Sequence, residues 1–152
     1  FKENKFRMGF ITFIYKILPL FVFVSYPVLI CYLILTGSAK LLQCITVPLG
    51  VFVTVTLIRK FINAQRPYEK LNITPLMNKT TKGKSFPSRH TASGIVIAMA
   101  FLYVNPVIGA VYLAVALLIS LSRVLSGVHF PRDVAASIVY AVAMSCLFFY
   151  VL

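Results

Sequence analysis

Both histidines of this chain stand in polar segments whose neighbouring side chains could support phosphoryl transfer. His129 is followed four residues later by Asp133, one of only three acidic residues in the chain. A carboxylate at this position could orient the imidazole and stabilise its charged form, as it does when histidine works as a base or a nucleophile. His90 stands apart and could donate a proton to a leaving alkoxide. We therefore predict His129, Asp133 and His90 as catalytic residues.

Arginines near these histidines are suited to holding the phosphate. A guanidinium group is permanently charged and presents a planar fork of donors that matches phosphate oxygens. Ser88 and the backbone N–H groups around it precede an apolar stretch, and the N-terminus of a helix favours anions. The predicted phosphate-binding residues are Arg59, Arg66, Ser88, Arg89 and Arg123.

The elements that must position these residues are membrane-spanning helices. Of the 152 residues, 60% are hydrophobic and 12% are charged, and the mean hydropathy is +0.92. Soluble domains are about half apolar and a quarter charged, and a helix needs about 20 mostly apolar residues to cross a bilayer. The apolar stretches predict about five spans, at residues 9–35, 41–58, 91–104, 106–121 and 134–152.

Helix counting places the two polar segments at one face of the membrane. The third and fourth spans are short, and a turn at Asn105-Pro106 separates them because proline lacks an N–H and restricts the residue before it. The long polar loop 66–88 and the connection 122–133 then emerge on the same side. We expect an all-α, polytopic bundle that forms one membrane-embedded domain over residues 1–152. Residues 1–8 are expected either to lie along the membrane surface or to be a solvated flank.

The formal charge of +12 would suggest nucleic acid as a partner of a soluble protein. In so apolar a chain we expect membrane lipids and no nucleic acid. Eight of the fifteen Lys and Arg residues lie between Arg59 and Arg89. Lysines beside membrane spans are commonly interface anchors, and we interpret Lys2, Lys5, Lys40, Lys70 and Lys79 in this way. Lys82 and Lys84 are left open between anchoring and attraction of an anionic head group.

Three ordered motifs resemble the signature of the type 2 phosphatidic acid phosphatase (PAP2) superfamily, which also includes vanadium haloperoxidases. The family pattern is KxxxxxxRP, PSGH and SRxxxxxHxxxD. The third motif is complete in Ser122-Arg123, His129 and Asp133. The second reads Pro87-Ser88-Arg89-His90, with arginine in place of glycine. The first reads Arg59, six residues and Arg66-Pro67, with Lys60 beside the arginine that replaces lysine.

The resemblance implies a metal-independent hydrolase without a cofactor. His129 would attack phosphorus and form a phosphohistidine, supported by Asp133, and His90 would protonate the leaving group. The five residues predicted above would hold the phosphate. The implied substrate is a lipid phosphate or diphosphate, such as phosphatidylglycerol phosphate, phosphatidic acid or undecaprenyl pyrophosphate. The resemblance implies an extracytoplasmic or luminal site, whereas the positive-inside rule, taken literally, would place the basic face in the cytoplasm. We expect a multi-pass protein of a bacterial plasma membrane with its site on the extracytoplasmic face.

Two other functions remain open from the sequence. A non-catalytic binder or transporter of anionic lipids would also carry intramembrane charges, although the polar residues here stand at loop margins rather than in the middle of spans. A vanadium-dependent haloperoxidase would use the same pocket, but the membrane spans argue against it. We favour the phosphatase.

Overall fold

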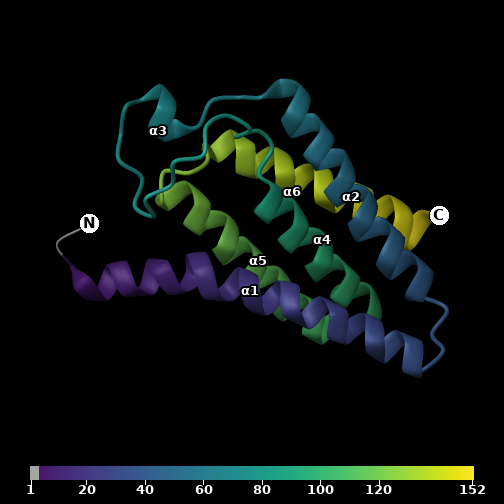
Figure 1. Ribbon diagram of the computed structural model, residues 1–152. Coiled ribbons are helices and arrows are strands. Elements are labelled where there is room, and N and C mark those ends of the chain that lie inside the picture. Colours follow the sequence, from purple (N-terminus) through teal and green to yellow (C-terminus); the bar gives the residue numbers. More distant parts are fainter. Residues whose placement is uncertain (1–3) are drawn as a thin grey trace.

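The computed structural model describes residues 4–152, and this part of the chain is helical and contains no strand (Figure 1). The apolar stretches of the sequence form these helices, and the polar segments connect them. The helices are α1 (Lys5–Leu35), α2 (Leu41–Ile62), α3 (Pro67–Lys70), α4 (Arg89–Val104), α5 (Pro106–Leu125) and α6 (Pro131–Cys146), which continues into the π-helical segment η1 (Leu147–Val151).

Five of these helices form the predicted polytopic bundle. Four are long and apolar enough to cross a membrane: α1, α2, α5 and α6 with η1. The fifth, α4, is shorter, and it lies at the centre of the bundle in contact with α1, α2, α5 and α6. Every residue of α4 from Thr91 to Phe101 is buried. A helix that is apolar on all sides and enclosed by others is typical of the core of a bundle.

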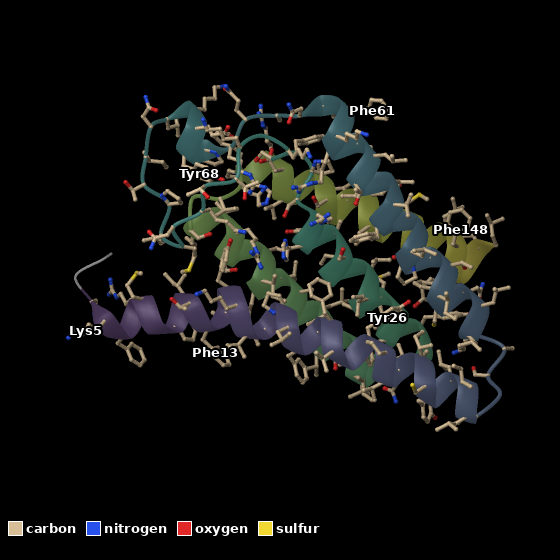
Figure 2. All side chains as sticks on the ribbon, viewed as in Figure 1. Lys5, Phe13, Tyr26, Phe61, Tyr68 and Phe148 are labelled. Atoms are coloured by element: carbon tan, nitrogen blue, oxygen red, sulfur yellow. The ribbon has the colours of Figure 1, made fainter. Side chains whose placement is uncertain are left out.

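The outer surface of the bundle is apolar, as a lipid-facing surface should be. Large hydrophobic side chains that would be costly in water are widely exposed on it; Phe13 is 50% exposed and Phe61 is 82% exposed. Figure 2 shows both side chains projecting away from the bundle, while Tyr26 points inward from α1. The Tyr26 hydroxyl donates to the carbonyl of Cys44 at 2.6 Å and so joins α1 to α2.

The predicted turn between the third and fourth spans is present. Helix α4 ends at Val104, and the Asn105 side chain accepts from the N–H groups of Val107 and Ile108 at the start of α5. The two helices then pack closely: a Cβ atom added to Gly109 would lie 2.1 Å from the Cα atom of Leu102. Glycine at this position permits the contact that holds the α4–α5 hairpin together.

Several helix ends differ from the predicted limits. Helix α1 begins at Lys5 and not at residue 9, so residues 5–8 form its first turns, while residues 1–3 of the expected surface segment lie outside the described residues. Helix α2 continues to Ile62 and stops at Asn63, which has a left-handed φ of 46°. Helix α5 continues to Leu125. In each case the helix continues through a basic residue outside the predicted span: Arg7, Arg59 or Arg123.

Candidate active site

Four helix ends meet at one side of the bundle, as the sequence predicted. The end of α2, the start of α4, the end of α5 and the start of α6 converge there, and the connection from α2 to α4, which contains α3, lies over them (Figure 1). Beneath this connection is a cavity of about 330 Å³, which we call the polar cavity. Its lining residues are Tyr15, Thr56, Arg59, Lys60, Arg66, Lys79, Thr81, Lys84, Arg89, His90, Arg123, Val128 and His129.

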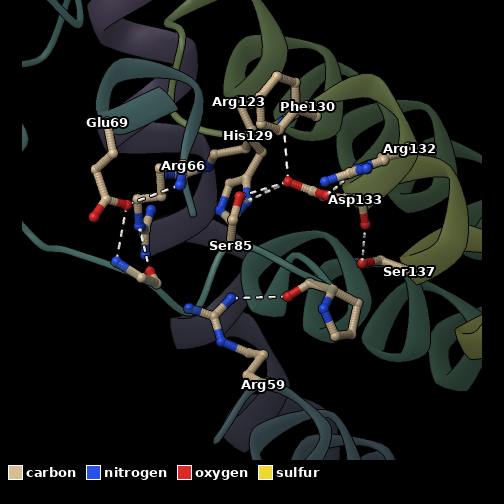
Figure 3. Close-up of polar contacts among 12 residues, drawn as sticks. Arg59, Arg66, Glu69, Ser85, Arg123, His129, Phe130, Arg132, Asp133 and Ser137 are labelled. Carbon is tan, nitrogen blue, oxygen red and sulfur yellow. Dashed lines mark hydrogen bonds and ion pairs between the residues drawn. The ribbon is translucent and has the colours of Figure 1, made fainter. Parts of the chain in front are cut away.

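His129 is held against a buried carboxylate (Figure 3). Its Nδ1 atom lies 3.7 Å from Oδ2 of Asp133, and the side chains are 3% and 0% exposed. Ser85 donates from Oγ to the same oxygen at 2.5 Å, and its Oγ lies 3.4 Å from His129 Nδ1. Because Nδ1 faces these groups, Nε2 is the ring nitrogen left for the cavity.

The position of Asp133 follows from the start of α6. Pro131 occupies the first turn of the helix, where a missing N–H costs nothing. Asp133 stands at the third helical position, and its Oδ2 accepts from the N–H of Phe130 at 3.0 Å. Its main-chain carbonyl accepts from the N–H of Ser88 at 3.2 Å. This last hydrogen bond links the segment that bears His129 to the start of α4, which bears His90.

Three of the arginines are buried and fixed by backbone carbonyls. Arg59, Arg66 and Arg123 are 9%, 6% and 3% exposed. Arg59 donates to the carbonyl of Pro87 at 2.9 Å, and Arg66 donates to that of Gly83 at 3.0 Å. Each bond uses one N–H of a guanidinium that carries five, so donors remain for an anion.

Arg123 is held by α1 rather than by the loop. It donates to the carbonyl of Tyr15 at 3.1 Å, and its guanidinium lies 3.9 Å from the centre of the Tyr15 ring. Arg123 belongs to the last turn of α5. The aromatic face and the carbonyl together stabilise a cation buried between two membrane helices.

Glu69 organises the loop that carries Arg66. Its Oε2 atom accepts from the N–H of Arg66 at 2.8 Å and from the N–H of Gly83 at 2.9 Å (Figure 3). Gly83 has φ of +66°, and a Cβ atom there would lie 2.4 Å from Oδ1 of Asn63. The two loop segments that contain Arg66 and Gly83 are therefore joined where Arg66 enters the cavity.

The electrostatics of the polar cavity strongly favour an anion. Among residues 4–152, its lining includes no carboxylate. It includes seven cationic side chains: Arg59, Lys60, Arg66, Lys79, Lys84, Arg89 and Arg123.

Burial, reinforced by the charges of Arg66 and Arg123, lowers the pKa of Lys79. Burial also lowers the pKa of His129 below 6.5; the nearby carboxylate of Asp133 opposes this shift, and the nearby arginines reinforce it. This shift favours the neutral imidazole, whose ring nitrogen has a lone pair for nucleophilic attack.

The structure places the eight predicted site residues in two groups. Six line the polar cavity: Arg59, Arg66, Arg89, His90, Arg123 and His129. Asp133 lies behind His129, and Ser88 is fully buried with a hydroxyl that has no hydrogen-bond partner within the described chain. The N–H of Ser88 is already bonded to Asp133. Arg59 is buried and the adjacent Lys60 is exposed, but both face the cavity.

The sequence did not indicate several residues of the site, among them Ser85, Tyr15 and Lys79. Ser85 lies outside the three motifs, and Tyr15 is one aromatic residue among many in the first span. Lys79, which we expected to be an interface anchor, lines the polar cavity instead. Its place in the long polar loop was visible in the sequence, but the fold of that loop over the helix ends was not.

A second, apolar cavity adjoins the first. It has a volume of about 560 Å³ and lies among α1, α2 and α4. Phe23, Tyr26 and Phe52 are among its lining residues. Arg89 and His90 line both cavities and therefore mark their junction. An amphiphilic ligand with an anionic head would find both environments side by side.

Within residues 4–152, no group of three His, Cys, Asp or Glu side chains is placed to hold a metal ion.

Comparison with known sequences gives a family and two curated relatives. The sequence model of the PAP2 superfamily matches residues 32–152. Undecaprenyl-diphosphatase BcrC of Bacillus subtilis (strain 168) is 42% identical over 65 residues, which are 43% of this chain and 34% of that protein. Bacitracin transport permease protein BcrC of Bacillus licheniformis is 34% identical over 84 residues, which are 53% of this chain and 41% of that protein. The matches thus span less than half the length of these relatives.

Two crystal structures share the fold. That of Aquifex aeolicus LpxE has a TM-score of 0.77 and 24% identity, with 95% of this chain and 86% of the other covered. That of a transmembrane PAP2-type phosphatidylglycerolphosphate phosphatase from Bacillus subtilis has a TM-score of 0.67 and 22% identity, with 95% and 76% covered. The helices of this chain are thus arranged as in these two structures.

Proposed function

Because the chain belongs to the PAP2 superfamily, we propose that it is an integral membrane phosphatase that removes the terminal phosphate of a lipid phosphate or lipid diphosphate. One observation carries the proposal: seven cations and both histidines line a cavity that contains no carboxylate among the described residues and adjoins an apolar cavity. A phosphate group suits the first environment, and a lipid chain suits the second. A substrate whose tail remains in the bilayer would meet both at once.

The reaction we propose begins with attack by Nε2 of His129 on phosphorus. Asp133 and Ser85 hold the opposite side of the imidazole, and the carboxylate stabilises the positive charge that the ring gains during attack. Arginine donors stabilise the charge on the transferring phosphoryl group. His90 donates a proton to the leaving oxygen. Water then hydrolyses the phosphohistidine and releases inorganic phosphate.

Similarity to named proteins narrows the choice of substrate class. One relative is named an undecaprenyl-diphosphatase, and this favours a lipid diphosphate. Phosphatidylglycerol phosphate and phosphatidic acid are the other candidates, since one of the crystal structures is of a phosphatidylglycerolphosphate phosphatase. We further propose that the protein resides in a bacterial plasma membrane with its site on the extracytoplasmic face, where it would act without a metal or other cofactor.

The first test is phosphate release by the purified protein in detergent with EDTA present. We would supply undecaprenyl pyrophosphate, phosphatidylglycerol phosphate and phosphatidic acid to the wild type and to a His129→Gln variant. We expect release from at least one lipid and a loss of at least about a thousandfold in the variant, because the nucleophile is gone.

The Lys70→Gln variant is the matched control, because Lys70 is exposed and does not line the polar cavity. Its activity should equal that of the wild type. Equal activity in His129→Gln would refute the assignment of the nucleophile. Binding of these lipids by folded wild type without any phosphate release would instead indicate a non-catalytic binder.

A further inference from the structure

We propose that Arg89 makes the site selective for lipid diphosphates by binding the phosphate that lies next to the lipid. This inference rests on the proposed phosphatase function and names the substrate class. Arg89 occupies the second-motif position where the family pattern has glycine, so a glycine there would provide no such group.

Arg89 stands where a second phosphate would have to be. It is the first residue of α4, and it lines both the polar cavity and the apolar cavity, as does His90. A ligand that extends from His129 to the apolar cavity therefore passes these two residues. The phosphorus under attack lies beside His129, so the part of the substrate at the junction belongs to the leaving group.

The Arg89 guanidinium is also available for a ligand. Within residues 4–152 it has no hydrogen bond or ion pair, whereas Arg59, Arg66 and Arg123 each donate to a backbone carbonyl. The ring of Phe52 lies beside it, with the ring centre 5.5 Å from the guanidinium carbon. The ring can position the cation without using its N–H donors.

The chemistry of the leaving group distinguishes the two substrate classes. With a lipid diphosphate, a bond forms between Nε2 of His129 and the terminal phosphorus, and the bond from that phosphorus to the bridging oxygen breaks. The electron pair remains on the bridging oxygen, which becomes an oxygen of the released lipid monophosphate and can accept a proton from His90. Negative charge therefore develops beside Arg89. With a lipid monophosphate the leaving group is an alcohol, and no second phosphate lies at the junction.

The test compares two substrates with the same tail, farnesyl diphosphate and farnesyl monophosphate. We would measure kcat/KM for both with the wild type and with Arg89→Gln, Arg89→Lys and Arg89→Gly variants in detergent. The wild type should prefer the diphosphate. The ratio of the two kcat/KM values should fall about tenfold or more in Arg89→Gln and Arg89→Gly, because a charge-assisted contact to one substrate is lost. Arg89→Lys should keep part of the preference, because it keeps the charge without the guanidinium fork.

Lys60→Gln is the matched control, because Lys60 lines the polar cavity only. It should lower both kcat/KM values by similar factors and leave their ratio unchanged. An unchanged ratio in the active Arg89→Gln and Arg89→Gly variants would overturn this inference while leaving the phosphatase intact. A wild type that released phosphate from neither these substrates nor the lipids tested above would overturn both proposals.

Discussion

At the scale of single residues, the pairing of His129 with Asp133 determines how activity should depend on pH. The net effect of burial, the nearby arginines and Asp133 is to lower the pKa of His129 below 6.5. The neutral imidazole is the nucleophilic form, so it should persist below pH 6.5. Activity should be lost only as the pH falls through the lowered pKa, where the ring becomes protonated.

An Asp133→Asn variant tests this pairing. The nearby carboxylate of Asp133 raises the pKa of His129, and the variant removes its charge. The acid limb of kcat/KM should therefore move to lower pH than in the wild type. The rate should also fall, on the order of a hundredfold or more, because the carboxylate no longer stabilises the charged ring. The measurement is a pH–rate profile of both proteins with one substrate.

Comparison with the wild type on the same substrate cancels the ionisation of the substrate phosphate. An acid limb that stayed in place or moved to higher pH would show that the limb does not report His129 next to Asp133.

Residue types and spacing were sufficient to predict six residues that line the polar cavity, but not the groups that support them. Ser85 donates to Asp133 from a part of the loop that carries no motif. Tyr15 supports Arg123 from a helix more than a hundred residues away. Such contacts depend on tertiary structure, and neither local spacing nor residue type indicates them.

At the scale of helices, the number and order of spans were predictable because the lengths of apolar stretches must match the bilayer. The helix ends were not. Arg123 was assigned to a polar connection, yet it lies in the last turn of α5 and is buried. Hydropathy treats an arginine as the end of a span, whereas a helix continues through an arginine whose charge faces a polar cavity. Arg66 lies beyond the end of α2 at Ile62 and reaches the polar cavity from the loop.

The α4–α5 hairpin makes a prediction about stability. In Gly109→Ala the new methyl group would overlap the backbone of Leu102, from which a Cβ atom would be 2.1 Å. The helices would have to separate, so we expect the free energy of unfolding to fall by about 1–3 kcal/mol. Thermal unfolding in detergent would measure this loss.

Gly50→Ala provides the matched control. Gly50 is also helical, but nothing lies within 4 Å of its added Cβ atom. Alanine has the better helix propensity, so the variant should be as stable as the wild type or more so. Equal effects of the two substitutions would contradict the close contact at Gly109.

At the scale of the whole molecule, positive charge is gathered at one end of an apolar bundle. Seven cations surround the polar cavity, and their mutual repulsion should destabilise the folded state when no anion is present. Inorganic phosphate should therefore raise the midpoint of thermal unfolding. A ligand at a hundred times its dissociation constant stabilises the folded state by about 2.7 kcal/mol.

The measurement is a thermal melt in detergent with increasing phosphate, against sodium chloride at matched ionic strength. Chloride screens exposed charges but lacks the oxygens that guanidinium groups bind in pairs. A melting temperature that rose equally in both salts would indicate general screening in place of a phosphate site.

The junction of the two cavities at Arg89 and His90 also bears on how turnover ends. The proposed reaction separates a phosphate bound in the polar cavity from a lipid that extends through the junction into the apolar cavity. The two products therefore enter different phases: the lipid diffuses laterally into the bilayer, and orthophosphate departs into water. Dilution of orthophosphate in the bulk solvent then opposes resynthesis of the substrate. The direction of turnover is therefore governed by the partition of the products between phases as well as by the free energy of hydrolysis. Accumulated orthophosphate would slow the enzyme by occupying the polar cavity after the products have left, whatever the density of the lipid product in the membrane.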